Sequence, residues 1–195
     1  WLWEASHPNR SWPSRPDLYF WQALKMGGLP RYLPFLPWLP APMFDLPPAI
    51  AAGEIPQQCV VATIQRYQIP ATLIVGILGQ ENGRVGTASR NSNGSVDYGP
   101  GQVNSIWLET LAPYGVTAKD LQWDGCKNLW VSGWIMRRCL NKFNNNAWMA
   151  IGCYHAGENP RTDTHVRRMY SYAGLVQEKS LKYGPGFQRW LMTKE

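Results

Sequence analysis

Prolines are concentrated at the start of this chain, and they restrict where regular structure can form. Eleven of the sixteen prolines and five of the eleven tryptophans lie in residues 1–56. Proline lacks an amide hydrogen and fixes φ, so it interrupts helices and central strands. The stretch 29–48 is typical of an extended, polyproline-like chain. We therefore expect an irregular Pro/Trp-rich segment over residues 1–56, with helical character only at 17–25, and a folded domain over residues 57–195.

The folded domain has the periodicity of a mainly helical protein. Apolar residues recur at steps of three and four, which predicts helices near the ranges 57–67, 71–82, 104–112, 118–122, 127–142, 147–156 and 164–181. Residues 92–103, rich in Gly, Asn and Ser, predict an irregular loop or a small sheet of two or three strands. Trp130 and Trp134 have the spacing of a helix core, and we expect neither to be a platform for a sugar ring. The expected class is mainly α (α+β).

Glu81 stands where a carboxyl group should resist ionisation. The apolar residues in 73–78 repeat at helical spacing, and Glu81 continues their face just before Gly83. Burial disfavours the charged form of an acid, and the negative end of the helix dipole acts in the same direction. Such an acid could protonate a leaving group near neutral pH. A partly exposed Glu at a frayed helix end fits the same pattern.

A long polar loop follows Glu81, and a second helix ends in an aromatic residue. Residues 82–104 are dense in amides, hydroxyls and glycines, which favour turns and hydrogen bonds. A sugar polymer offers matching hydroxyls and amides, although a plain solvated loop has the same composition. Tyr154 lies on one helix face with Ala147 and Ile151, where it could also be ordinary core.

Three short segments form a set in which order and spacing are informative. They are Gln80–Gly83, then Arg90–Gly99 followed by Gln102–Leu108, and finally Ile151–Gly157. Together they resemble the lytic transglycosylase family, bacterial enzymes with a goose-lysozyme-like fold that cleave peptidoglycan. The resemblance covers about residues 57–160 and is closest to small members associated with type IV secretion and conjugation systems. It implies a lysozyme-like helical domain with a cleft between Glu81, the polar loop and Tyr154.

The resemblance also implies a reaction and a set of site residues. Glu81 would be the catalytic acid that protonates the departing oxygen of the MurNAc-GlcNAc β-1,4 bond. It would then act as the base while the 6-hydroxyl of the muramic acid attacks, which gives a 1,6-anhydromuramoyl end. Substrate-binding roles fall on Gln102, Asn104, Tyr154 and Asn91.

The chain departs from the family pattern in two places. Asn82 stands where the family usually has Ser, and residues 99–102 read Gly-Pro-Gly-Gln instead of Gly-Leu-Met-Gln, which leaves substrate preference open. The acid of this loop, Asp97, suits a turn-capping role, whereas a hydrolysing glycosidase needs a second catalytic carboxylate. The alternatives are therefore a lysozyme-type muramidase and a non-catalytic cell-wall binding module.

Four cysteines bear on the compartment. Cys59, Cys126, Cys139 and Cys153 show no Cys-x-x-Cys pairing, which argues against a zinc site or a redox centre. Their even number favours disulfides with three possible connectivities, and buried free thiols are the alternative. The resemblance favours Cys59–Cys126, and Cys139–Cys153 would then bridge neighbouring helices. Disulfides fit an oxidising periplasm. We find no signal-peptide pattern and no transmembrane span, so any export signal is absent from this chain.

The chain has more basic than acidic residues, which is compatible with two kinds of anionic partner. A net charge of +6 and a pI near 9.3 suit either nucleic acid or an anionic cell wall. The basic residues are scattered without a groove-reading pattern, so we expect peptidoglycan glycan strands and no nucleic acid. The three histidines lack metal-ligand spacing, and we expect no metal and no cofactor. Residues 1–56 could dock secretion or conjugation apparatus proteins, or could be an unordered leader.

Overall fold

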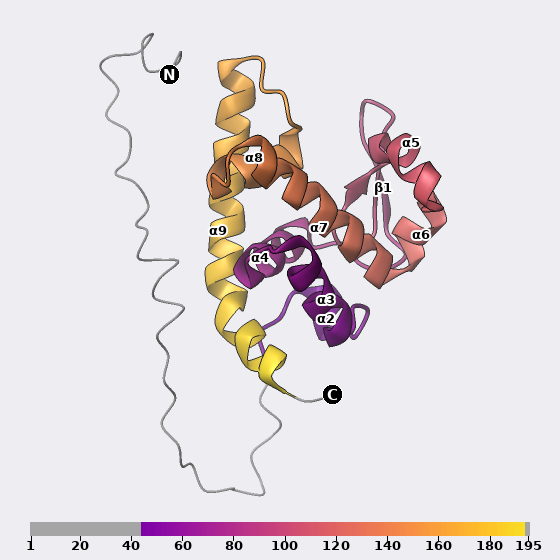
Figure 1. The fold of residues 1–195 in the computed structure, drawn as a ribbon, viewed down its shortest axis with the longest axis vertical. Coiled ribbons are helices and arrows are strands. Elements are labelled where there is room, and N and C mark those ends of the chain that lie inside the picture. The colour runs from indigo at the N-terminus through magenta and orange to yellow at the C-terminus, as the bar shows by residue number, and fades with distance from the viewer. Residues whose placement is uncertain (1–43, 194–195) are drawn as a thin grey trace, which may run out of the picture. The chain divides into compact units, whose positions relative to one another are not determined.

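The computed structural model describes residues 44–193, and these form a mainly helical domain with one small sheet (Figure 1). Its helices are α2 (Pro48–Ala51), α3 (Gln57–Tyr67), α4 (Ala71–Glu81), α5 (Leu108–Leu111), α6 (Ala118–Trp123), α7 (Gly125–Lys142), α8 (Ala147–Ala156) and α9 (Asp163–Met192), with the 3-10 turns η2 (Ser105–Trp107) and η3 (Ala112–Tyr114). Strands β1 (Ala88–Arg90), β2 (Val96–Tyr98) and β3 (Val103–Asn104) form an antiparallel sheet in that order. The predicted fold class is confirmed.

Residues 47–56 contribute to this domain although the sequence grouped them with the irregular segment. Pro48 opens the single turn of α2, and Ala49, Ile50 and Ile55 are buried. Proline suits the first turn of a helix because its missing amide hydrogen has no partner there. The division of the chain at residue 57 stays a prediction. The expected helix over 17–25 lies outside the described residues.

Helix α9 is longer than the sequence predicts. We expected an end near residue 181 because Gly184, Pro185 and Gly186 follow, but the helix continues to Met192 with Pro185 inside it. Tyr183 and Phe187 flank this proline on the buried side of the helix. Burial of these two rings compensates for the backbone hydrogen bond that proline removes.

Helix α9 packs against both α4 and α8, and α7 packs against α8 and α3. In Figure 1 α9, drawn in yellow, runs along one side of the helices, and the sheet lies beyond α7. Close contact between α4 and α9 requires a small residue at Gly79, where a Cβ would lie 2.6 Å from the ring of Tyr183. The pair therefore fixes the C-terminal end of α4 relative to α9.

The expectation that Trp130 and Trp134 belong to the core is wrong. Trp130 is 45% exposed and Trp134 is half-buried, whereas Leu129 and Met136 of α7 are fully buried. A spacing of four residues places two side chains on one helix face but does not say which face meets the core.

The sheet is attached to α7 by a buried amide. The Nδ2 of Asn128 donates to the carbonyl oxygens of Tyr98, at 2.7 Å, and Leu121, at 2.8 Å, and its Oδ1 accepts from the backbone N–H of Gly101 at 2.8 Å. Asn128 is fully buried, so all three hydrogen bonds are shielded from water. They hold residues 99–102, which connect β2 and β3, against the side of α7.

Both favoured disulfides are present. Cys59–Cys126 joins α3 to α7, and Cys139–Cys153 joins α7 to α8. Together they link α3, α7 and α8, in which α7 packs against both of the other helices.

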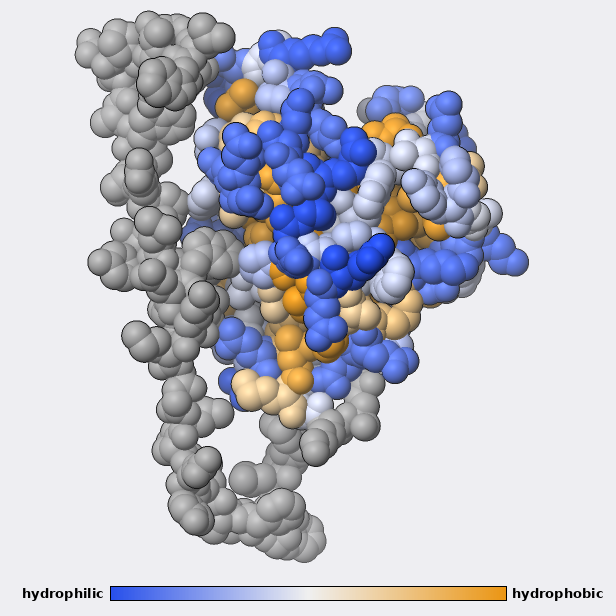
Figure 2. Space-filling model, in the orientation of Figure 1, coloured by the Kyte–Doolittle hydropathy of each residue, from blue (hydrophilic) through white to orange (hydrophobic). Residues whose placement is uncertain are grey.

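The surface seen in Figure 2 is largely hydrophilic, with hydrophobic residues visible between the polar ones in both its upper and its lower half. Among residues 44–193, no helix combines the length and apolar character that crossing a membrane requires.

Candidate functional site

Glu81 is the last residue of α4, and the chain turns sharply after it. Asn82 caps the helix in the left-handed region, with φ of 53°, and its N–H donates to the carbonyl oxygen of Leu78 at 3.1 Å. Asparagine tolerates this conformation better than most residues. The departure at Asn82 from the family pattern is therefore compatible with the turn, which leaves the Glu81 side chain at a helix terminus.

Gly83 brings the chain after Glu81 against the loop that follows β2. A Cβ at this position would lie 2.2 Å from the carbonyl oxygen of Gly99 and 2.8 Å from the Nε2 of Gln102, so only glycine fits. Gln102 has a φ of 48°, and its Nε2 donates to the carbonyl oxygen of Gly99 at 2.8 Å. The sequence-predicted residues Glu81 and Gln102 therefore lie on two segments in direct contact.

The carboxyl group of Glu81 is largely buried and holds its proton unusually well. Burial raises its pKa from the ordinary 4.5 to about 7, as the sequence predicted, and the negative charge of Asp97 adds to this increase. A hydrogen bond from the hydroxyl of Tyr172 to Oε1 opposes it by stabilising the charged form. Near neutral pH, protonated and ionised Glu81 are therefore both populated.

Tyr172 is a site residue that sequence reasoning missed. It lies on α9, is 5% exposed, and donates to Glu81 from 91 positions further along the chain. Its pKa is raised by burial and by the nearby Glu81. His155 stacks on its ring with the centroids 4.4 Å apart. In the sequence Tyr172 has the helical spacing of the buried residues Met169 and Val176, so its pattern indicates only core.

Asn91 and Asn104, both predicted to bind substrate, meet at Asp97 on the sheet. The Nδ2 of Asn91 donates to Oδ2 of Asp97 at 2.8 Å, and the Nδ2 of Asn104 donates to Oδ1 at 2.6 Å. Both amides also donate to the hydroxyl of Ser95. Asp97 lies within β2 rather than in a turn, so the expected turn-capping role is wrong. Its carboxylate instead orders the two asparagines.

Tyr154 lies in the last turns of α8 and reaches the same loop as Gln102. Its hydroxyl donates to the carbonyl oxygen of Gly101 at 2.7 Å. Burial is the main cause of its raised pKa, and the charge of Glu81 contributes. Tyr154 is therefore a neutral hydrogen-bonding group beside the acid.

The structure thus places Glu81, Gln102 and Tyr154 around one loop, with Asn91 and Asn104 joined through Asp97 on the neighbouring sheet. Within the described part of the chain, no group of three His, Cys, Asp or Glu side chains could hold a metal ion. Glu81, with its raised pKa, is a group that can transfer a proton at this site.

The fold and the site define a lysozyme-like domain built around a single largely buried glutamic acid. The family model described as "Transglycosylase SLT domain" matches residues 58–173, which is more than half of the chain. This protein therefore belongs to the SLT lytic transglycosylase family, as the motifs suggested. The matched region contains Glu81 and Tyr172 as well as the predicted substrate-binding residues.

Three relatives match part of this chain at low identity. The chain is 29% identical over 114 residues to "Invasion protein IagB" of Salmonella typhimurium, which covers 58% of this chain and 70% of that protein. It is 29% identical over 98 residues to "Protein IpgF" of Shigella flexneri, and the match covers 50% of this chain and 64% of that protein. It is 30% identical over 112 residues to an "X polypeptide" of Escherichia coli, and the match covers 56% of this chain and 64% of that protein.

Proposed function

We propose that this protein is a peptidoglycan lytic transglycosylase that cleaves the MurNAc-GlcNAc β-1,4 bond and leaves a 1,6-anhydromuramoyl end. The observation that carries this proposal is the pKa of about 7 at Glu81. An acid with a pKa near the working pH can both give up and take back a proton within one reaction. Membership of the SLT family supports peptidoglycan as the substrate class.

Glu81 acts twice in the proposed reaction. Because Oε1 accepts the hydrogen bond of Tyr172, Oε2 is the oxygen that carries the proton to the glycosidic oxygen. The bond from C1 of MurNAc to that oxygen breaks, and the N-acetyl group of the substrate stabilises the positive charge that develops at C1. Ionised Glu81 then accepts the proton of the MurNAc 6-hydroxyl while the oxygen of that hydroxyl bonds to C1. Glu81 is therefore protonated again at the end of the reaction, and no water is consumed.

The remaining site residues are proposed to hold the substrate. Gln102 lies next to Gly83, which follows Glu81 by two residues, and Tyr154 donates to Gly101 of the same loop as Gln102. These positions favour roles in orienting the acetamido group of the substrate. Asn91 and Asn104 are fixed by Asp97, so their positions on the sheet are well defined for contacts with the glycan. Preorganised groups of this kind lower the entropic cost of binding.

A hydrolysing muramidase is the alternative reaction, and the environment of Asp97 argues against it. A retaining glycosidase needs a second carboxylate as nucleophile, and an inverting one needs it as a base for water. Both carboxylate oxygens of Asp97 already accept hydrogen bonds from asparagine amides. We therefore assign Asp97 to ordering the sheet.

The proposed setting is the periplasm, where local opening of the wall would serve a secretion or conjugation apparatus. Two disulfides fit an oxidising compartment. A relative named as an invasion protein and the resemblance to secretion-associated members support the link to an apparatus.

Digestion of purified peptidoglycan tests the proposal directly. Wild-type protein should release fragments with anhydro ends, which are lighter by one water than the products of hydrolysis, and Glu81→Gln should release none while remaining folded. Glu109→Gln, which removes an exposed carboxylate on α5, is the matched control and should keep wild-type activity. Reducing ends would establish the muramidase instead, and an absence of soluble fragments would indicate a binding module.

A further inference from the structure

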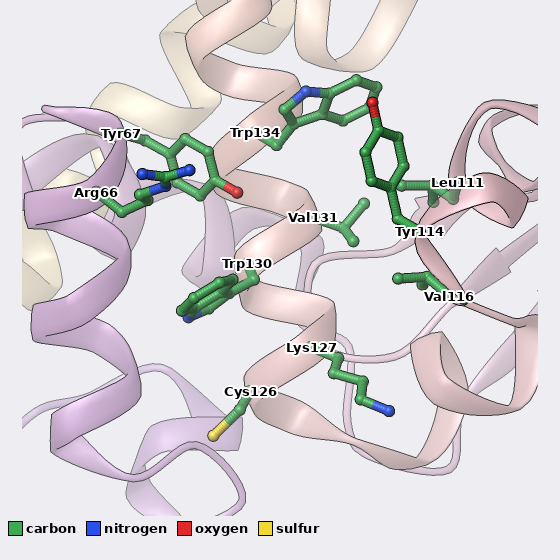
Figure 3. A pocket seen from close by; sticks show the side chains of 11 residues that line it. Arg66, Tyr67, Leu111, Tyr114, Val116, Cys126, Lys127, Trp130, Val131 and Trp134 are labelled. Atoms are coloured by element: carbon green, nitrogen blue, oxygen red, sulfur yellow. The ribbon is translucent and has the colours of Figure 1, made fainter.

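A groove lined by aromatic and basic side chains lies between the C-terminal end of α3, the N-terminal half of α7 and the segment 111–116 (Figure 3). Its volume is about 700 Å³, within the range of cavities that bind small ligands or a few sugar rings. The side chains that matter here are Arg66, Tyr67, Tyr114, Lys127, Trp130 and Trp134. We call this feature the aromatic groove.

The aromatic groove is on the opposite side of α7 from the site that contains Glu81. Asn128 and Ser132 of α7 face the loop of residues 99–102, since Asn128 binds Gly101 and a Cβ on Gly101 would meet the hydroxyl of Ser132. Trp130 and Trp134 each follow these residues by two positions, which is a rotation of about 200° around the helix. A molecule in the groove would therefore leave Glu81 accessible.

The walls of the groove are held in place. Arg137 donates from Nε to the carbonyl oxygen of Tyr67 at 2.6 Å, which ties the end of α3 to α7, and the Cys59–Cys126 disulfide joins the same two helices. Trp134 packs edge-on against the ring of Trp107 with the centroids 5.3 Å apart. Rings that are fixed before binding lose little entropy when a ligand covers them.

Aromatic surface in the groove is exposed to an unusual extent. Trp130 is 45% exposed and Tyr114 is 79% exposed. In Figure 3 the rings of Tyr67, Trp130, Trp134 and Tyr114 surround the opening from three sides. Such rings offer flat apolar faces with polar edges, which suits pyranose rings that carry apolar faces and hydroxyl rims.

The groove carries one basic side chain whose charge is not compensated by a described residue. Arg66 is exposed and has no ion pair with the described residues, whereas Lys127 is already paired with Asp120 at 2.5 Å. None of the described lining residues is acidic. Arg66 is therefore complementary to a glycan that carries carboxylates, as peptidoglycan does on its stem peptides.

We propose that the aromatic groove binds a second peptidoglycan strand, whose sugar rings stack on Trp130 and Tyr114 while Arg66 contacts its carboxylates. This inference rests on the proposed function for the identity of the polymer. Attachment at the groove keeps the enzyme on the wall and raises the effective concentration of glycan at Glu81. The groove then promotes attack on the insoluble wall without taking part in the reaction.

Binding to purified, insoluble peptidoglycan sacculi tests the proposal in a Glu81→Gln background, where no cleavage interferes. Trp130→Ala and Arg66→Glu should each weaken binding about tenfold, because aromatic and arginine contacts commonly dominate an interface. Tyr114→Ala provides a further variant at a highly exposed position where folding is not at risk. Raised salt should weaken the binding of the parent protein more than that of Arg66→Glu.

Matched controls come from outside the groove. Trp123→Ala removes an exposed tryptophan of α6, and Arg189→Glu reverses an exposed charge on α9; both should bind sacculi like the parent protein. With Glu81 intact, Trp130→Ala should solubilise sacculi more slowly but cleave short soluble glycan fragments at the wild-type rate. Equal loss on both substrates would place Trp130 in the reaction and overturn the inference.

Unchanged sacculus binding by all three groove variants also overturns the proposal. If Trp130→Ala instead changes self-association in sedimentation experiments, the groove is an interface between copies of the chain. If Trp130→Ala changes neither sacculus binding nor self-association, a different protein becomes the candidate occupant of the groove. The muropeptide digest with wild-type protein decides the proposed function independently, because it requires products and not groove binding.

Discussion

The pKa of Glu81 should make the stability of this protein fall as the pH rises through the weakly acidic range. The folded protein keeps the carboxyl proton up to about pH 7, whereas in the unfolded chain Glu81 ionises with the ordinary pKa of 4.5. Between these two values the unfolded state binds fewer protons, so raising the pH favours unfolding. Below pH 4.5 the effect is absent, and above pH 7 it is complete.

The size of the effect follows from the two pKa values. Each tenfold change in proton affinity corresponds to about 1.4 kcal/mol, so the increase from 4.5 to about 7 amounts to about 3 kcal/mol above pH 7. Glu81→Gln removes this penalty, because an amide cannot ionise and its oxygen can still accept from Tyr172. For a chain of this size the variant should melt about 6–12 °C higher than wild type at pH 8.

Urea unfolding of both proteins at pH 4 and pH 8 measures this difference. We expect similar free energies of unfolding at pH 4 and a gap of about 3 kcal/mol in favour of Glu81→Gln at pH 8. Glu109→Gln, at an exposed position, should show no such gap. If wild type and Glu81→Gln show the same pH dependence from 4 to 8, the carboxyl group is not perturbed and the reasoning about the acid is refuted.

Three further predictions concern the neighbours of Glu81 and a disulfide. Tyr172→Phe removes the hydrogen bond that stabilises ionised Glu81, so the alkaline limb of the pH–rate profile should move to higher pH; no shift would contradict the contact. Asp97→Asn should retain substantial activity, and because it removes a negative charge that raises the pKa of Glu81, the alkaline limb of its pH–rate profile should move to lower pH. A collapse in rate without unfolding would point to a two-carboxylate hydrolase. Replacing Cys139 and Cys153 by Ser opens a loop with a sequence separation of 14, so unfolding in urea should require about 3 kcal/mol less in the chain-entropy model, and an unchanged midpoint would show the bridge to be dispensable.

The sequence predicts the helices well where short-range pattern and terminal residues agree. The bounds expected for α3, 57–67, are those of the structure, and α4 ends one residue before the expected 82. The raised pKa of Glu81 could be predicted because the acid continues an apolar helix face, and that signal depends only on residues within two helical turns. Its proposed catalytic role came from the resemblance to the family. The same local logic places a small sheet near 92–103, although its first strand begins earlier, at Ala88.

The interactions that the sequence does not reveal are those between distant segments. Tyr172 is separated from Glu81 by 91 residues, and its helical spacing is that of ordinary core. The role of Asp97 depends on the antiparallel register that pairs it with Ser89 and Asn104, which no local pattern specifies. Trp130 and Trp134 show that periodicity finds a face without telling whether another element covers it. Pro185 shows that packing can maintain a helix through a residue that usually ends one.

Helix α9 has a consequence for the order in which the site is completed during synthesis. Glu81 and the loop around it are encoded before residue 105, but the hydroxyl that binds Glu81 and the helix that covers α4 arrive only with residues 163–192. A nascent chain that ends before Asp163 contains every motif of the site and none of this support. The hydrogen bond to Glu81 and the packing of α9 on α4 should therefore form only after translation has passed Tyr172.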